Sequence, residues 1–287
     1  MSEVERKVVR PRSFPESGPI AVAAAANERG GRAVARGCQL ARELRRDLAF
    51  VQIIDGTAFR ERRSTELSDL ETRTGEAPGL SGLEVAVAAY PGHHVDHEYG
   101  RAVTLCDHLG DVGAGLVVIG TRDIGAKNKP LSGSMTQRLL QYTPCPVLVA
   151  QNAAPEPYHK VVVAADFSEV SESLIRQALD LAPEASIEVL TAIGAKDDPD
   201  EVLKEFRMLT DAAAFSEDAR RRLSFRTIPG HAKKILASEI ARLAPDLLVL
   251  GTRGRSAVAQ LILGSVSSAF ADNPPCDLLL IRSAGQH

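Results

Sequence analysis

The sequence predicts an α/β protein made of two similar units, each a parallel five-stranded sheet flanked by helices. Three observations lead to this fold class. Apolar runs such as 161–163 and 247–250 contain no alternating polar residues, which is typical of strands buried on both faces. Stretches with helical periodicity separate these runs, as in sheets whose parallel strands are joined by helices. The third observation is an internal repeat that spans most of the chain.

The repeat is clearest at two glycine-containing frames that lie 131 positions apart. In the second half, Gly251 follows an apolar run, and the pair Gly264-Ser265 comes later. In the first half, Gly120 and Gly133-Ser134 occupy the same frame. A Pro-Cys pair then precedes the last apolar run of each half. The chain is therefore a tandem of two homologous units.

The length of 287 residues suits about two domains. The join falls in the polar, proline-containing stretch 151–158. We therefore expect a first domain at residues 1–152 and a second domain at residues 158–287.

The elements of the second unit follow from periodicity and from helix breakers. Val170, Leu174 and Ala178 share one face of a helix, and Pro274 and Pro275 stop the last helix before a strand. In chain order we expect strand 161–165, helix 168–182, strand 187–193, a largely helical stretch 198–223, strand 224–228, helix 231–243, strand 247–250, helix 265–271 and strand 277–281.

Composition and charge exclude several classes of protein. A net charge of −3 and the absence of Trp give no support to nucleic-acid coating or to a base-stacking surface. The sequence has no run of 18 apolar residues, the length that a membrane-spanning helix needs. Residues 1–12 contain no apolar secretion core. The four cysteines lack zinc or redox spacing, which indicates reduced thiols. We expect a cytoplasmic protein without nucleic-acid or membrane partners.

The glycines of the second half are placed to hold a phosphate. A spaced set of glycines after a strand lets backbone N–H groups approach an anion, and Gly264-Ser265 begins a helix whose N-terminus favours negative charge. Arg253 and Arg255 could screen phosphate charge. The alternative is that Gly251 and Gly254 only form turns and that the arginines are a solvated loop face. No Gly-Lys-Ser/Thr sequence follows, so the frame is not a P-loop.

Asp166 follows the first strand of the second half. Ligands of open parallel sheets bind at the carboxyl ends of strands where the strand order reverses, so Asp166 and Gly251 share a crevice if their strands are neighbours. A carboxylate there can accept a hydrogen bond from a nucleobase amino group. The alternative is a helix N-cap, because Glu169 stands at capping-box spacing from Asp166.

These residues resemble the universal stress protein family, in its tandem form and its ATP-binding branch. The family signature Gly-x2-Gly-x9-Gly-Ser/Thr is matched by Gly251, Gly254 and Gly264-Ser265, and residues 163–168 resemble the family's opening strand. The resemblance covers nearly the whole chain. It implies that each domain has a Rossmann-like fold of the adenine nucleotide alpha hydrolase-like type.

The resemblance also implies roles for individual residues. Asp166 would contact adenine, Ala192 would pack against the base, and the glycine loop with the helix start would hold ribose and phosphates. The implied nucleotide-binding residues are Ala164, Ala165, Asp166, Ala192, Leu250, Gly251, Arg253, Gly254, Gly264, Ser265 and Val266.

The first half departs from this pattern. Ala25 stands opposite Asp166, and Asp123 replaces Gly254. Two like charges about 4 Å apart repel by about 4 kcal/mol at an effective dielectric constant near 20, so Asp123 would oppose a phosphate. Lysines nearby could offset part of this repulsion. We therefore expect a nucleotide in the second half only.

A histidine group in the first half is a candidate metal site. His93 and His97 would share a helix face at i, i+4, a spacing that suits two metal ligands. The alternative is a solvated helix start, and the second half has no counterpart.

The expected function is a stress-response protein that binds ATP, or AMP or ADP, and acts as a nucleotide-dependent regulatory or signalling module. Mg²⁺ could accompany ATP. The second half has no evident Ser-His-Asp triad or paired carboxylates, so we expect no enzyme beyond weak ATP hydrolysis. The alternatives are a slow ATPase of the same fold and a nucleotide-free interaction or metal-sensing protein.

The family resemblance implies dimerisation through the last strand. In a tandem chain, residues 147–150 and 278–281 could satisfy this interface internally, as a pseudo-dimer of the two domains. Whether the full chain also forms a homodimer is left open by the sequence.

Overall fold

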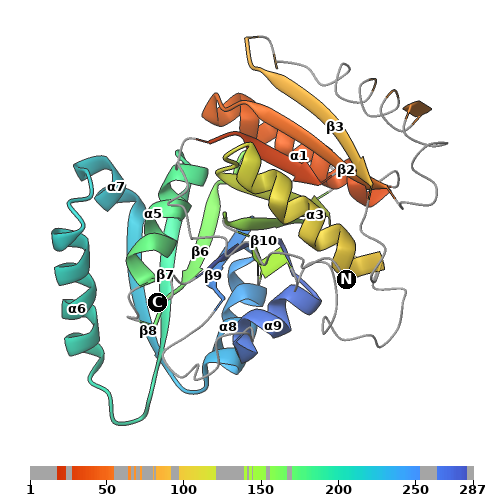
Figure 1. Ribbon diagram of the computed structural model, residues 1–287. Helices are drawn as coiled ribbons and strands as arrows, with labels where there is room; N and C mark the ends of the chain where they lie inside the picture. Colours follow the sequence, from red (N-terminus) through yellow and green to blue (C-terminus); the bar gives the residue numbers. More distant parts are fainter. Residues whose placement is uncertain are drawn as a thin grey trace, which may run out of the picture.

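The computed structural model of the chain describes residues 18–23, 28–54, 64–65, 68, 72, 80, 82–91, 97–120, 139–140, 142–143, 145–152, 156–166, 170–252 and 264–282. Within this part of the chain, ten strands form one continuous sheet with helices on both faces (Figure 1). None of the helices described there is long and apolar enough to cross a membrane.

The first half supplies five strands in the order β3-β2-β1-β4-β5, and all of their pairings are parallel. The chain alternates between strands and helices, as the sequence predicts. The elements are β1 (Ile20–Ala23), α1 (Glu28–Leu44), β2 (Leu48–Ile54), β3 (Val85–Pro91), α3 (His97–Asp111), β4 (Leu116–Gly120) and β5 (Val147–Ala150).

The second half repeats this order as β8-β7-β6-β9-β10, again with parallel pairings. The predicted fold class, two tandem Rossmann-like units with five parallel strands each, is confirmed. The elements are β6 (Lys160–Ala164), α5 (Ser171–Leu181), β7 (Ser186–Ile193), α6 (Pro199–Ala212), α7 (Glu217–Arg222), β8 (Leu223–Pro229), α8 (Ala232–Leu243), β9 (Leu247–Gly251), α9 (Ser265–Asp272) and β10 (Asp277–Ile281).

The stretch 198–223 is largely helical, as expected, and consists of the two helices α6 and α7. The side chain of Asp198 accepts a hydrogen bond from the Asp200 N–H at 2.9 Å and caps α6. The chain then turns through Ala214, whose φ of 50° lies in the left-handed region, and Ser216 caps α7 by accepting from the Ala219 N–H at 3.1 Å. The break comes from these local caps, which the apolar periodicity does not reveal.

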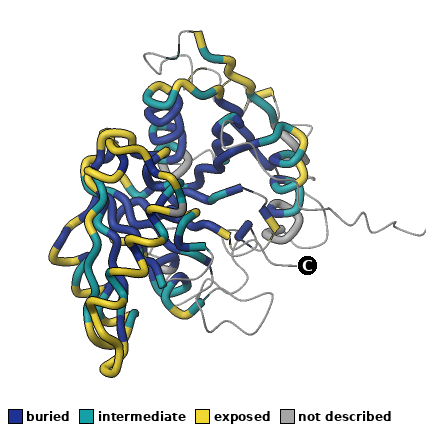
Figure 2. Tube along the Cα trace, turned by 90° about the vertical axis from the view of Figure 1, so that its left-hand side faces the viewer, coloured by how far each residue is buried: buried dark blue, intermediate teal, exposed yellow. Residues whose placement is uncertain are grey.

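Two apolar cores lie on the two faces of the sheet. Alternate strand residues such as Val163 and Val249 pack with α1, α5 and α6 on one face. Their neighbours, such as Val162 and Leu248, pack with α3, α8 and α9 on the other face. Figure 2 shows the buried residues concentrated in the strands, with the exposed ones at the surface of the helices and turns. Burial on both faces explains why the strands lack polar alternation.

The two halves join through their last strands. β5 and β10 pair in antiparallel register, with Leu278 opposite Val149 and Leu280 opposite Val147. The expected pairing of 147–150 with 278–281 is therefore confirmed, and it makes the two sheets continuous. The domain limits 1–152 and 158–287 remain a prediction, because residues 153–155 of the join lie outside the described part.

A buried polar network reinforces this junction, and the sequence analysis did not predict it. Arg36 of α1 forms an ion pair with Asp277 of β10 at 2.6 Å, and these side chains are 1% and 0% exposed. Asp277 also accepts hydrogen bonds from the Tyr158 hydroxyl at 2.8 Å and from the Gln151 N–H at 2.7 Å. The Arg36 guanidinium lies 4.3 Å from the centre of the Tyr158 ring. The network connects the first half, the joining segment and the second half.

Candidate functional site

The candidate site lies where two adjacent strands of the second half end. β6 pairs with β9, and Ala164 stands opposite Leu250 in this register. Asp166 therefore comes two residues after one end of the paired stretch, and Gly251 comes directly after the other. β7 lies on the far side of β6, and β10 lies on the far side of β9, so the strand order reverses at this point. The expected adjacency of the two strands is confirmed.

The chain before Asp166 is held by β7. The Ala165 N–H donates to the Leu190 carbonyl at 3.0 Å, and the Thr191 hydroxyl donates to the Ala165 carbonyl at 3.0 Å. Asp166 itself is half-buried. These bonds continue the strand pairing one residue past Ala164 and fix the point from which Asp166 leaves the sheet.

The structure does not test the alternative interpretation of Asp166 as a helix cap, because residues 167–169 lie outside the described part. α5 begins at Ser171, and Val170 occupies its N-cap position, four residues after Asp166. Glu169, the other half of the supposed capping box, lies outside the described residues.

Several of the expected lining residues lie on one face of the sheet. Leu250 belongs to the core beneath α8 and α9, and Ala164 and Val266 pack against that core. Ala192 falls on the same face because it comes two residues after Leu190, a member of this core. Ala165 alternates to the opposite core. Ala164, Leu250 and Val266 thus lie on the side of α8 and α9, whereas Ala165 faces the other side.

Hydrogen bonds connect the two ends of the glycine frame, the end of β9 and the start of α9. The Gly264 N–H donates to the Thr252 carbonyl at 2.9 Å, and the Thr252 N–H donates to the Ile281 carbonyl at 2.8 Å. The Ser267 hydroxyl donates to the Gly251 carbonyl at 2.6 Å. These bonds place the start of α9 beside the end of β9. Arg253 and Gly254, between these two ends, lie outside the described residues.

The start of α9 has the properties of an anion site. Gly264 occupies its N-cap position, and no side chain among the described residues caps the helix. The first N–H groups of a helix have no partner within it, and the helix dipole is positive at this end. Ser265, the first residue of α9, is exposed. Backbone N–H groups and a hydroxyl are therefore available to a phosphate or carboxylate here.

The remaining expected residues are not placed by the structure. Ala25, Asp123 and His93 lie outside the described residues. His97 begins α3, but its side chain is not described. Among the residues that the structure does describe, no three His, Cys, Asp or Glu side chains are grouped as metal ligands. The metal site at His93 and His97 stays a prediction.

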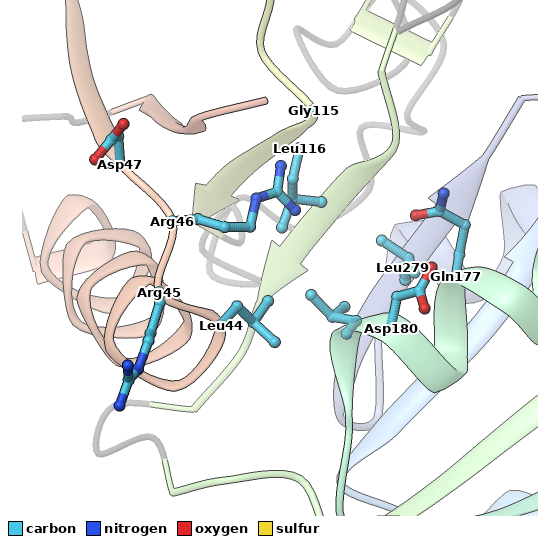
Figure 3. A pocket seen from close by; sticks show the side chains of 10 residues that line it. Leu44, Arg45, Arg46, Asp47, Gly115, Leu116, Gln177, Asp180 and Leu279 are labelled. Atoms are coloured by element: carbon cyan, nitrogen blue, oxygen red, sulfur yellow. The ribbon is translucent and has the colours of Figure 1, made fainter. Parts of the chain in front are cut away.

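A cavity of about 710 Å³ lies elsewhere, between the two halves. Figure 3 shows Leu44, the last residue of α1, and Arg46, which follows this helix. Both lie across from Gln177 and Asp180 of α5. Burial lowers the pKa of Arg46, and its Nε donates to the Gly18 carbonyl at 2.8 Å. The cavity lies on the α1 and α5 side of the sheet, and none of the expected nucleotide-binding residues lines it. It is therefore separate from the candidate site.

The sequence analysis missed Thr191 and Ser267, whose hydroxyls bond the carbonyls at the two strand ends. Thr191 had a signal, because it is the one hydroxyl within the apolar part of strand 187–193. Ser267 had none, since a serine in the first turn of a helix is common and indicates no particular contact.

Solved structures share this fold across the whole chain. A universal stress protein from Archaeoglobus fulgidus superimposes with a TM-score of 0.69 at 14% identity, over 92% of this chain and 98% of that one. A putative universal stress protein from Pseudomonas aeruginosa gives a TM-score of 0.67 at 20% identity, over 93% of this chain and 94% of the other. At these identities the likeness concerns the fold alone.

Sequence comparisons identify the family. A putative universal stress protein of Staphylococcus haemolyticus is 28% identical over 144 residues, which cover 44% of this chain and 86% of that protein. A universal stress protein of Mycobacterium bovis is 30% identical over 190 residues, or 60% of this chain and 63% of the relative. The sequence profile of the universal stress protein family matches twice, at residues 17–151 and 157–282. The chain therefore belongs to the universal stress protein family and carries one family unit in each half.

Proposed function

We propose that the second half binds an adenine nucleotide, ATP or else AMP or ADP, and that the protein acts as a nucleotide-dependent regulatory module in a stress response. The observation that carries this proposal is the meeting of Asp166 and the Gly251 to Gly264 frame at the ends of β6 and β9. Open parallel sheets bind nucleotides at this place. We further propose that the protein works in the cytoplasm.

The two sides of the site would recognise different parts of the nucleotide. On the base side, Asp166 accepts a hydrogen bond from the adenine amino group, and the small side chains of Ala164 and Ala192 leave room for the ring. On the phosphate side, the N-terminus of α9 at Gly264 and Ser265 donates to phosphate oxygens. Arg253 would add charge, and Mg²⁺ would enter with ATP through its phosphates.

Binding without fast turnover fits the residues around the phosphates. The segment 251–266 contains no Asp, Glu or His that could activate a water molecule or hold a metal. We therefore propose a nucleotide sensor rather than an enzyme. Measurable phosphate release in the presence of Mg²⁺ would instead favour the slow ATPase.

The first half is proposed to bind no nucleotide. Ala25 cannot accept a hydrogen bond from adenine through its side chain, and Asp123 would repel a phosphate. Its contribution would be to pair with the second half through β5.

Calorimetric titration of ATP into nucleotide-free protein tests this proposal. We expect one site per chain, which Asp166→Ala weakens and Gly254→Asp abolishes. Asp200→Ala is the matched control, because Asp200 is an exposed aspartate on α6. Two sites per chain would show that the first half also binds. Absence of ATP binding by the unaltered protein would favour the alternative of a nucleotide-free interaction or metal-sensing protein.

A further inference from the structure

We propose that two buried hydroxyls, those of Thr191 and Ser267, position the two sides of the nucleotide site. Thr191 would set the base side and Ser267 the phosphate side. This inference rests on the proposed nucleotide binding and adds residues that touch no nucleotide themselves. Each hydroxyl bonds the backbone carbonyl at which the chain leaves the sheet beside the crevice.

On the base side, Thr191 controls the peptide that precedes Asp166. Its side chain is 3% exposed and donates to the Ala165 carbonyl at 3.0 Å, while the Ala165 N–H donates to the Leu190 carbonyl at 3.0 Å. Both polar groups of Ala165 are thus bound by β7, after the pairing of β6 has ended at Ala164. A buried carbonyl without a donor is costly, so loss of the hydroxyl would make this peptide turn and carry Asp166 with it.

On the phosphate side, Ser267 ties α9 to the end of β9. Its side chain is 5% exposed, and its hydroxyl donates to the Gly251 carbonyl at 2.6 Å. The adjacent bond from the Gly264 N–H to the Thr252 carbonyl closes the same junction. Together these bonds hold the first N–H groups of α9 at a fixed distance from the strand end. Without the hydroxyl, the phosphate-binding N-terminus would be less well placed.

On the base side, the first half provides a contrast. Ile20 pairs with Leu48, and its counterpart Val161 pairs with Ile187, so the register places Gln52 at the position of Thr191. A glutamine with a longer side chain stands there instead of a hydroxyl. The hydroxyl of Thr191 is therefore present in the half that has Asp166. The half that has Ala25 carries Gln52 at this position instead.

The test compares two nucleotides that differ only at the group Asp166 would read. ATP carries the adenine amino group, and purine riboside triphosphate carries a hydrogen in its place. We expect Thr191→Val to weaken ATP binding by about 3- to 10-fold, the worth of one hydrogen bond, and to lower the preference for ATP over the analogue toward that of Asp166→Ala. We expect Ser267→Ala to weaken both nucleotides equally and to leave the preference unchanged.

Two further variants separate positioning from a general loss of packing. Thr191→Ser keeps the hydroxyl and should retain the nucleotide preference. Thr210→Val removes a hydroxyl that donates to the Arg207 carbonyl at 2.9 Å within α6, and it should change neither affinity nor preference.

The inference is overturned if Thr191→Val keeps the full preference while Asp166→Ala loses it, or if Ser267→Ala binds both nucleotides as well as the unaltered protein. If the unaltered protein binds neither nucleotide, the proposed function and the inference both fail. If it binds both with equal affinity, the base-side assignment to Asp166 and Thr191 fails, whereas the phosphate-side assignment to Ser267 is still decided by its own variant.

Discussion

At the scale of single residues, the junction between the halves depends on one buried carboxylate. Asp277 forms an ion pair with Arg36. It also accepts hydrogen bonds from the Tyr158 hydroxyl and from the backbone N–H groups of Gln151 and Asn152. Burial and the charge of Asp277 raise the pKa of Tyr158 well above its usual value, so its hydroxyl keeps the proton that it donates. A buried charge is tolerated only when it is paired and hydrogen-bonded, and here it is both.

Removing one member of this pair should destabilise the whole chain. We expect Arg36→Met to lower the free energy of unfolding by about 3–5 kcal/mol, because it leaves Asp277 buried without its counter-charge. The measurement is urea unfolding followed by circular dichroism. Arg242→Met is the control: Arg242 is 58% exposed and pairs with Glu239 at 2.7 Å, so its loss should cost less than about 1 kcal/mol. Equal effects of the two variants would contradict a special role for Arg36.

At the scale of elements, local sequence signals predict the strands well and the helix ends less well. β10 has the bounds expected from the sequence, 277–281, and it follows Pro274 and Pro275, which stop the preceding helix. The helix expected at 168–182 is described as α5 from Ser171 to Leu181, and residues 167–169 before it lie outside the described part. The site shows the same division. The glycine frame is visible in the sequence, whereas the contacts of the Thr191 and Ser267 hydroxyls depend on which strands and helices pack together.

The last strand of each half begins after a buried cysteine, and this makes stability depend on pH. Burial raises the pKa of Cys145 to about 11 and that of Cys276 to about 12. An unfolded chain loses these protons near pH 8.5, so unfolding releases protons above that value. The contribution of the thiols is complete below about pH 8.5 and is lost as the pH rises toward 11 or 12.

We therefore expect the urea midpoint to decrease when the pH is raised from 7.5 to 10, and to decrease less in the double variant Cys145→Ala, Cys276→Ala. Urea unfolding of both proteins at the two pH values measures this difference. Comparing the decrease in midpoint between the two proteins removes the effect of other titrating groups. An identical decrease of the urea midpoint in both proteins would show that these two thiols do not contribute.

At the scale of the whole molecule, the two units of the tandem pair within one chain through β5 and β10. β5 and β10 bury Leu148 and Leu279 at the centre of the ten-stranded sheet, where each is at most 1% exposed. An uncovered strand edge with these residues would be open to pairing with another chain. The two halves are thus held together by a sheet that runs through both.

A fragment of residues 158–287 should accordingly form a homodimer through β10. Sedimentation velocity measures this, and a strictly monomeric fragment would contradict it. The fragment lacks Arg36, so Asp277 would enter the new interface without its counter-charge. We expect Asp277→Asn to strengthen the fragment dimer, although the same change should weaken the full chain by leaving Arg36 buried and unpaired.

The sequence by itself determined the repeat, the α/β class, the strands and the glycine frame beside Asp166, because these depend on neighbouring residues and on a period that can be read along the chain. The tertiary structure decided which buried polar groups meet. Tyr158 and Asp277 are 119 positions apart, and Thr191 bonds a carbonyl 26 positions away. Such pairs are set by how strands and helices pack, and apolar periodicity carries no information about them.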